Sequence, residues 1–101
     1  MPTVYITAPE DAAAALAESL VEDRLAACVN RVPCRSVYRW EGEVVDDEEV
    51  ILLAKTTAEQ TETLVESVVE NHPYDVPCIE VFEEDDVLSA FADWRADSVR
   101  D

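Results

Sequence analysis

The sequence of 101 residues predicts one α+β domain over residues 1–101, with two helices on one face of a four-stranded antiparallel sheet. Three observations lead to this prediction. Strand-type and helix-type segments alternate, the only glycine lies between two long extended segments, and a short aromatic segment suited to a helix follows the last strand. Apolar residues make up 49% of the chain, which is enough for one modest core despite the high charge.

The first strand and the first helix are predicted from residues 3–8 and the segment that follows. TVYITA is rich in β-branched and aromatic residues, as strands are. Pro9 favours a helix start, and Glu10 and Asp11 suit the first turn because carboxylates interact favourably with a helix N-terminus. The helix is expected to run to about Arg24, with an apolar inner face at helical spacing: Ala13, Leu16, Ala17, Leu20 and Val21.

The centre of the chain predicts a long hairpin. Residues 27–41 and 44–56 are both extended in character, and the second contains the apolar run 50–54. Gly42 lies between them, and glycine supplies the positive φ that a tight hairpin turn requires.

The third quarter of the chain predicts a second helix and a last strand. Thr57 and Gln60 have the spacing of a capping box at the helix start. Pro73 ends the helix, and Pro77 starts the last strand, CIEVF (78–82), because proline is tolerated at the first residue of a strand. The helix has an apolar face formed by Leu64, Val65, Val68 and Val69.

Residues 85–99 predict a C-terminal helix that carries Phe91 and Trp94. The order is therefore βαββαβ followed by a helix. Such an alternation with a hairpin at its centre is the split β-α-β pattern and predicts a ferredoxin-like sandwich with a long central hairpin.

The predicted hairpin is longer than the domain. A strand of about 14 residues spans roughly 46 Å, whereas a domain of about 100 residues has a diameter near 33 Å. An overhanging edge leaves backbone groups unpaired and favours pairing with another chain. The sequence thus predicts a homo-oligomer built through residues 34–50. The alternative is a monomer whose hairpin is curled by twist and bulges.

The charge excludes several classes of partner. The net charge is −17, from 24 acidic and 7 basic residues, and Lys55 is the only lysine. A surface of this kind repels nucleic acid and anionic membranes. No apolar run has the length of a membrane span, and the acidic start does not match a signal peptide, so a cytoplasmic location is expected. Dispersed acids with almost no lysine indicate a very salty cytoplasm, that of a halophile.

We expect the protein to lose stability when it is diluted into low salt. At about 1 M salt the Debye length is ~3 Å, so repulsion among the acidic side chains is screened, and dilution restores that repulsion. Thermal melting at a series of KCl concentrations tests this. A melting temperature that stays constant on dilution would contradict the halophilic interpretation.

Neither the cysteines nor the other reactive residues predict catalysis. The chain has an odd number of cysteines, Cys28, Cys34 and Cys78, and none of them forms a C-x-x-C motif. This argues against a disulfide framework and against a zinc ribbon. Small buried thiols are the favoured interpretation. There is no glycine-rich phosphate loop and no nucleophile elbow, and no serine or cysteine adjoins the only histidine, His72. We therefore expect a protein that is not an enzyme, without catalytic residues.

Several motifs together resemble the CutA family of divalent-cation tolerance proteins. They cover nearly the whole chain in order, and AFADW in the last helix fits as well: RLAACVN (24–30), SVYRWEG (36–42), EVILLAKT (49–56) and HPYDVP (72–77). The resemblance implies a ferredoxin-like homotrimer whose long hairpins pair across subunits, similar in architecture to PII-type signalling proteins. It also implies a role in tolerance of copper or another divalent cation, with no organic cofactor.

The resemblance implies metal ligands at three positions of this chain. Two of them hold Ile6, which cannot bind metal, and Asn71, a poor ligand, so His72 alone remains as the candidate metal ligand. The residues themselves leave another role open. Leu64, Val68 and His72 are spaced four apart, so His72 also continues the inner helix face and suits a helix C-terminus.

Lys55 is the candidate for binding a ligand in a cleft between subunits, with Glu49, Tyr38, Trp40 and Tyr74 as neighbours there. The alternative is an internal ion pair between Lys55 and one of the many carboxylates. The leading function is thus a homotrimer that binds copper or another divalent cation. The rival is a PII-like signalling or scaffolding trimer that binds a small molecule or a partner protein in its clefts.

Overall fold

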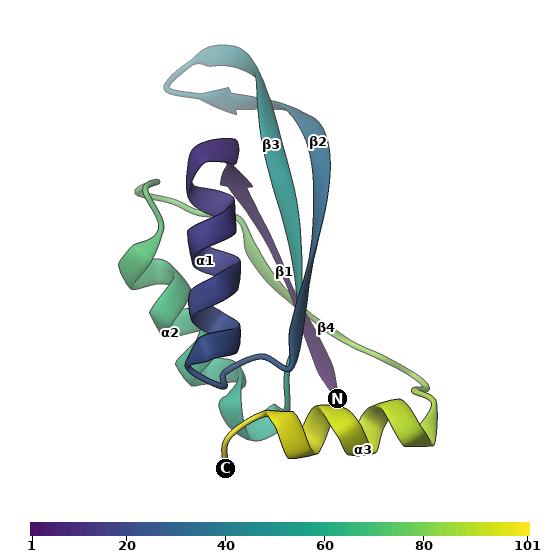
Figure 1. The fold of residues 1–101 in the computed structure, drawn as a ribbon. Helices are drawn as coiled ribbons and strands as arrows, with labels where there is room; N and C mark the ends of the chain where they lie inside the picture. Colours follow the sequence, from purple (N-terminus) through teal and green to yellow (C-terminus); the bar gives the residue numbers. More distant parts are fainter.

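The computed structural model describes all 101 residues and confirms the predicted order of elements (Figure 1). Its helices and strands are β1 (Pro2–Pro9), α1 (Glu10–Glu22), β2 (Cys28–Trp40), β3 (Glu43–Lys55), a 3-10 turn (Ala58–Gln60), α2 (Thr61–Asn71), β4 (Ile79–Glu83) and α3 (Ser89–Ser98).

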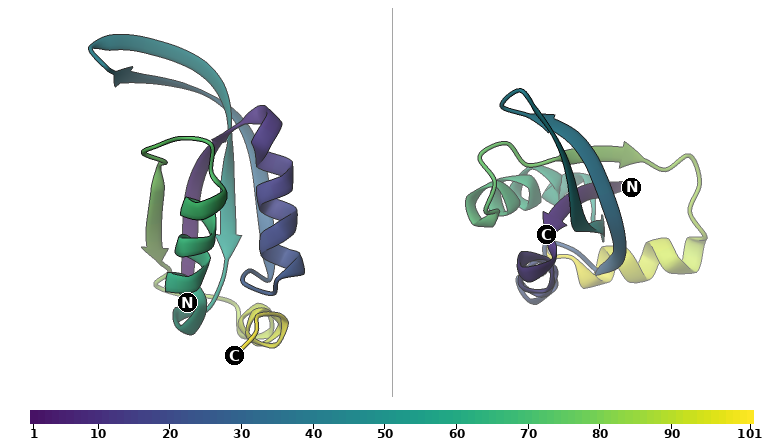
Figure 2. Two further views of the ribbon diagram at one scale, coloured as in Figure 1. Left: turned by 90° about the vertical axis from the view of Figure 1, so that its left-hand side faces the viewer. Right: turned by 90° about the horizontal axis from the view of Figure 1, so that it is seen from above.

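The four strands form one antiparallel sheet in the order β2-β3-β1-β4, with α1 and α2 against one face (Figures 1 and 2). This is the predicted ferredoxin-like sandwich. Alternate side chains of β1 and β3 point to the helices and form the core with them. The core includes Val4, Ile6, Leu52 and Ala54 from the sheet and Leu16, Leu20, Leu64 and Val68 from the helices.

The other face of the sheet carries no helix. We call it the open face and define it by five apolar residues that alternate with the core positions: Tyr5, Val32, Ile51, Leu53 and Phe82. Val32 and Phe82 are 42% and 48% exposed, and the other three are half-buried. The rings of Tyr5 and Phe82 lie 5.7 Å apart. A single chain therefore leaves an apolar sheet surface in contact with water.

The helix boundaries differ from the prediction in small ways. Helix α1 ends at Glu22, because Arg24 adopts a left-handed φ of 58° and turns the chain toward β2. Val21 and Val69, which were predicted on the inner faces, are 42% and 55% exposed. Each of them lies at the edge of the inner face of its helix, Val21 on α1 and Val69 on α2, where the side chain points toward water.

The predicted capping box at Thr57 is wrong. Thr57 makes no side-chain cap, and a 3-10 turn comes between it and α2. In this turn the Gln60 N–H donates to the backbone carbonyl of Thr57 at 3.2 Å, so the donor that a cap would satisfy is already used. The Thr61 hydroxyl donates to the same carbonyl at 2.8 Å.

The hairpin turns at Glu41 and Gly42, both with positive φ (50° and 83°), as the sole glycine predicts. Strand β1 pairs with β3 only as far as Glu49, so the pairs from Arg35 with Glu48 to the turn lie beyond the sheet. This arm extends about 20 Å at the usual rise of a strand. Figure 2 shows that it also curves over the end of the sheet, and the molecule measures 45 × 25 × 19 Å.

Helix α3 lies across the end of the sheet where the N-terminus emerges (Figure 1). The helix carries Arg95, whose side chain is only 1% exposed. The sequence did not predict a buried role for this residue. Its guanidinium donates to the carbonyl of Thr56 at 2.8 Å, to the carbonyl of Pro2, and to Glu84 Oε1 at 2.9 Å. One buried cation thus ties α3 to β1, to the end of β3 and to the segment after β4.

The longest helix, α1, has 13 residues, and no helix in the structure combines the length and apolar character that crossing a membrane requires.

Candidate functional site

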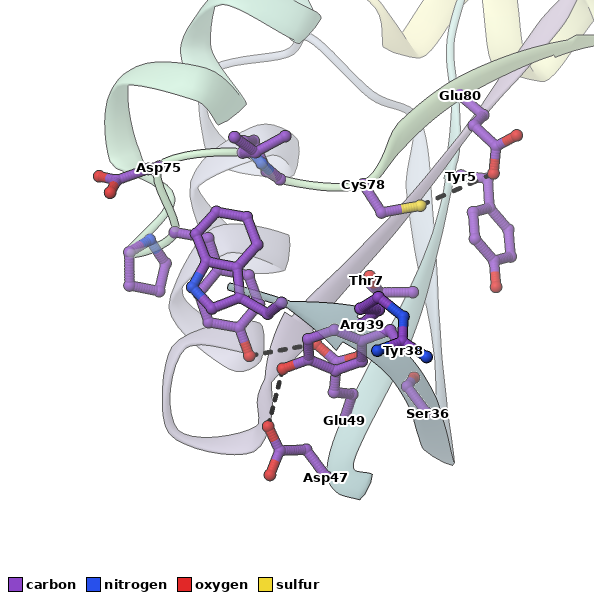
Figure 3. Close-up of a pocket in the computed structure, with 15 residues that line it drawn as sticks. Tyr5, Thr7, Ser36, Tyr38, Arg39, Asp47, Glu49, Asp75, Cys78 and Glu80 are labelled. Atoms are coloured by element: carbon purple, nitrogen blue, oxygen red, sulfur yellow. Dashed lines mark hydrogen bonds between the residues drawn. The ribbon is translucent and has the colours of Figure 1, made fainter. Parts of the chain in front are cut away.

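A pocket of about 880 Å³ lies where the curved hairpin faces the loop between α2 and β4 (Figure 3). Three parts of the chain line it: the ends of β1 and β4, the outer hairpin, and the loop 73–78. Except for Arg39, the strand residues of the lining belong to the open face, because residues of one parity along β2 and β3 point to that face. Aromatic and acidic residues are prominent in the lining, among them Tyr5, Tyr38, Trp40, Tyr74, Asp47, Glu49 and Glu80.

Glu49 is a buried carboxylate at this pocket. It is 5% exposed, and its Oε2 accepts a hydrogen bond from the Tyr74 hydroxyl at 3.2 Å. The Tyr38 hydroxyl donates to Asp47 Oδ2 at 2.8 Å, as Figure 3 shows. No arginine or lysine forms an ion pair with Glu49. Two phenols therefore turn their O–H groups toward carboxylates, and one of those carboxylates is buried without a cation.

The acidic surroundings act on both tyrosines. Burial, and then the negative charge of Glu49, raise the pKa of Tyr74 well above its usual value. The hydrogen bond to Asp47 is the main cause that raises the pKa of Tyr38. Both phenols therefore stay protonated and act as hydrogen-bond donors at neutral pH.

Four of the five residues predicted to bind a ligand line this pocket: Tyr38, Trp40, Glu49 and Tyr74. Lys55 does not line it. It lies six residues beyond Glu49 along β3, about 20 Å at the usual rise of a strand, and pairs with Thr3 and Cys28 at the opposite end of the sheet. The internal ion pair considered for Lys55 is also absent from the structure. Within one chain, Lys55 and the other four residues do not meet.

Sequence reasoning missed Tyr5, Asp47 and Glu80 as lining residues. The alternation of side chains along the strands could have indicated two of them. Tyr5 lies opposite Leu53, and Asp47 is two residues before Glu49 on β3, so both point to the open face. That the hairpin curves back over the sheet, and so brings them near Tyr74, was not visible in the sequence.

His72 is buried at the end of α2, and both of its ring nitrogens are engaged. Nε2 lies 2.8 Å from the carbonyl of Thr7, and Nδ1 accepts from the backbone N–H of Tyr74 at 3.1 Å. A carbonyl can only accept and Nδ1 accepts from an N–H, so in this arrangement Nε2 is the nitrogen that donates. The side chain connects α2, β1 and the pocket loop.

The donors of one chain do not fit a metal ion. No three His, Cys, Asp or Glu side chains converge anywhere in the structure. The other positions implied by the resemblance hold Ile6, which is fully buried in the core, and Asn71, whose amide donates to the carbonyl of Ser67. The expectation of buried thiols is wrong for Cys78, which is exposed. Partial desolvation still raises the pKa of its thiol, which disfavours the thiolate that metals prefer.

Replacing His72 by alanine is expected to lower the free energy of unfolding by about 2 kcal/mol, because the buried Thr7 carbonyl and the Tyr74 N–H both lose their partner. Chemical denaturation without added metal measures this. Asn71→Ala is the control, since its exposed amide makes one bond within the helix, and it is expected to cost far less. Equal stability of His72→Ala and the parent protein would contradict the bridging role.

Comparison with known proteins agrees with the motifs and the fold. The family model described as CutA1 divalent ion tolerance protein matches residues 2–98. The divalent-cation tolerance protein CutA of Thermus thermophilus is 55% identical over 76 residues, which is 73% of this chain and 74% of that protein. The CutA of Thermotoga maritima is 39% identical over 100 residues, which is 98% of this chain and 99% of that protein.

Solved structures show the same architecture. The divalent cation tolerance protein CutA1 of Thermus thermophilus superimposes with a TM-score of 0.92 at 45% identity, covering 99% of this chain and 100% of the other. The PII-like protein CutA of Nostoc has a TM-score of 0.95 at 32% identity, covering 99% and 98%. With the match of the family model over residues 2–98, these similarities show that the chain belongs to the CutA1 divalent ion tolerance family.

Proposed function

We propose that this protein acts in divalent-cation tolerance as a cytoplasmic homotrimer without catalytic activity. The observation that supports assembly most directly is the combination of an overhanging hairpin and an apolar open face in a single chain. The arm exposes unpaired backbone groups, and the open face exposes Val32 and Phe82. Packing against sister chains would satisfy both surfaces at once.

Copper is the cation that we propose for this role, with His72 as the candidate ligand. Ligation requires the Nδ1 atom to release the Tyr74 N–H, because both ring nitrogens are already engaged. The remaining ligands must come from a second chain or from exposed carboxylates, since no three donors converge within one chain. We thus expect any specific copper site to depend on the assembled trimer.

Two measurements on one sample test this function. Light scattering in concentrated KCl is expected to report three times the 11.3 kDa of one chain. Copper titration of the same sample is expected to show stoichiometric binding that His72→Ala removes and Asn71→Ala retains. A mass of one chain overturns the assembly. Weak, multivalent copper binding that molar salt abolishes overturns the specific site.

A second candidate function is suggested by the pocket: a PII-like trimer that binds a small molecule or a partner protein in clefts between its chains, with metal incidental. The supporting observation is that Tyr38, Trp40, Glu49 and Tyr74 lie together. For Lys55 to contribute to such a cleft, it must come from a neighbouring chain. Saturable binding that is unaffected by His72→Ala would favour this function over copper binding.

A further inference from the structure

We propose that Lys55 of one chain pairs with the carboxylates of Asp47 and Glu49 of a sister chain, and that this contact fixes which ends of two neighbouring chains meet. The sister chain thereby adds a cation to the pocket between the hairpin and the loop 73–78. This inference rests on the homotrimer of the proposed function and specifies the orientation of its chains.

The first argument is the position of Lys55. It lies two residues after Leu53 on β3, so it belongs to the open face, where it pairs with Thr3 and Cys28. The side chain is half-buried in a single chain and forms no ion pair. A sister chain packed on the open face would remove the ammonium group from water, which is strongly unfavourable unless a carboxylate meets it.

The second argument is that the carboxylates of the same chain do not meet Lys55. Glu84 lies at the same end of the sheet, but it pairs with the buried Arg95. Two carboxylates of the open face, Asp47 and Glu49, lie six or more residues away along β3, which is about 20 Å or more at the usual rise of a strand. They cannot reach Lys55 within one chain.

The third argument is symmetry. In a closed ring of identical chains with head-to-tail contacts, the front of each chain touches the back of the next, so unlike ends meet. The hairpin arm leaves one end of the sheet, beyond Glu49, and Lys55 lies at the other end, where the N-terminus emerges (Figure 1). An arm that reaches a sister chain therefore lies over the Lys55 end of that chain.

The fourth argument is the chemistry at the base of the arm. Asp47 Oδ2 accepts from the Tyr38 hydroxyl at 2.8 Å, and Glu49 Oε2 accepts from the Tyr74 hydroxyl at 3.2 Å. These bonds orient the two carboxylates and leave room for further donors, because an ionised carboxylate has about four lone-pair sites. Neither carboxylate pairs with a base of its own chain. The acidic end of one open face is thus complementary in charge to the end that carries Lys55.

Carbodiimide cross-linking of the full chain in concentrated KCl tests the contact directly. The reagent joins an amine to a carboxylate in contact with it as an amide, and Lys55 has the only side-chain amine of the protein. We expect covalent dimers and trimers on a denaturing gel, in which peptide mass spectrometry finds Lys55 joined to Asp47 or Glu49. Lys55→Arg is the matched control, since it keeps the charge without the amine: the mass from light scattering should stay the same and these products should disappear.

Charge reversal measures what the pair contributes to assembly. Lys55→Glu places like charges together and is expected to raise the chain concentration at which half of the trimer dissociates by at least about a hundredfold. Arg31→Glu is the matched control. It makes the same change of charge, but Arg31 is exposed and lies opposite Leu52, on the face of the sheet away from the open face, so assembly should not change.

Two results overturn the pair while light scattering still reports a trimer. One is the absence of a cross-link from Lys55 to Asp47 or Glu49, and the other is a Lys55→Glu trimer that dissociates at the same concentration as the parent protein. Both leave the homotrimer standing. A parent protein with the mass of one chain instead contradicts the homotrimer, and the pair is overturned with it.

Discussion

Replacing Arg95 by methionine is expected to lower the free energy of unfolding by about 3–5 kcal/mol, the usual effect of removing one partner of a buried ion pair. The side chain is 1% exposed and bonds the carbonyls of Thr56 and Pro2 as well as Glu84. Its loss leaves these acceptors buried, together with the Oε2 atom of Glu84, which already has no partner. Urea denaturation in concentrated KCl measures the change.

Two controls separate the buried pair from a general effect of charge. Arg35→Met removes an exposed arginine, 61% accessible, that pairs with Asp46 and Glu48, and should cost less than about 1 kcal/mol. The double variant Arg95→Met with Glu84→Leu should recover part of the loss, because no charge is then left uncompensated. Equal losses for Arg95→Met and Arg35→Met would contradict the anchoring role of Arg95.

The same pair gives a pH dependence of known sign. Although burial favours the neutral acid, hydrogen bonds from Thr3 and Arg95 hold the pKa of Glu84 below its ordinary value. A carboxyl whose pKa is lowered by folding stabilises the folded state at pH values above its pKa in the unfolded state, about 4.3. This contribution is lost as the pH falls through the pKa of the folded state. The stability difference between the parent protein and Glu84→Gln should therefore shrink below about pH 4.

Replacing Leu53 by aspartate is expected to convert the proposed trimer to single chains, so that the mass from light scattering falls to 11.3 kDa. Leu53 lies on the open face opposite Tyr5 and is outside the core cluster, so the chain itself should still fold. In an assembly that covers this face, each aspartate would be a buried charge without a partner, at a cost of several kcal/mol per chain.

Val69→Asp is the matched control for that experiment. Val69 is 55% exposed and lies on α2, on the opposite side of the sheet from the open face. Its replacement introduces the same charge in place of an exposed apolar residue and should leave the mass unchanged. A Leu53→Asp protein that remains a trimer would show that the chains meet elsewhere than on the open face.

Local pattern was enough to predict most of the architecture. The alternation of segments, the single glycine at 42 and the prolines at 73 and 77 act over a few residues, so the order of elements and the hairpin turn follow directly from them. The excess length of the hairpin also follows from residue counts. The predicted capping box at Thr57 is wrong, since the Gln60 N–H bonds the backbone carbonyl of Thr57 in a 3-10 turn and the Thr57 side chain makes no cap.

The chemistry of the pocket was decided by tertiary structure. Whether an acidic residue is solvated or buried depends on which distant segments cover it. The sequence contains 24 acidic residues, and only the fold shows that Glu49 is buried at the pocket and that Glu84 pairs with the buried Arg95. For the same reason the sequence does not show that Lys55 lies at the opposite end of the sheet from Tyr38, Trp40, Glu49 and Tyr74. The sequence by itself determined the strands, helices and turn, because these depend on neighbours along the chain. Only the curvature of the hairpin and the docking of α3 decided which charges are buried and what faces them, because burial depends on contacts between residues far apart in sequence.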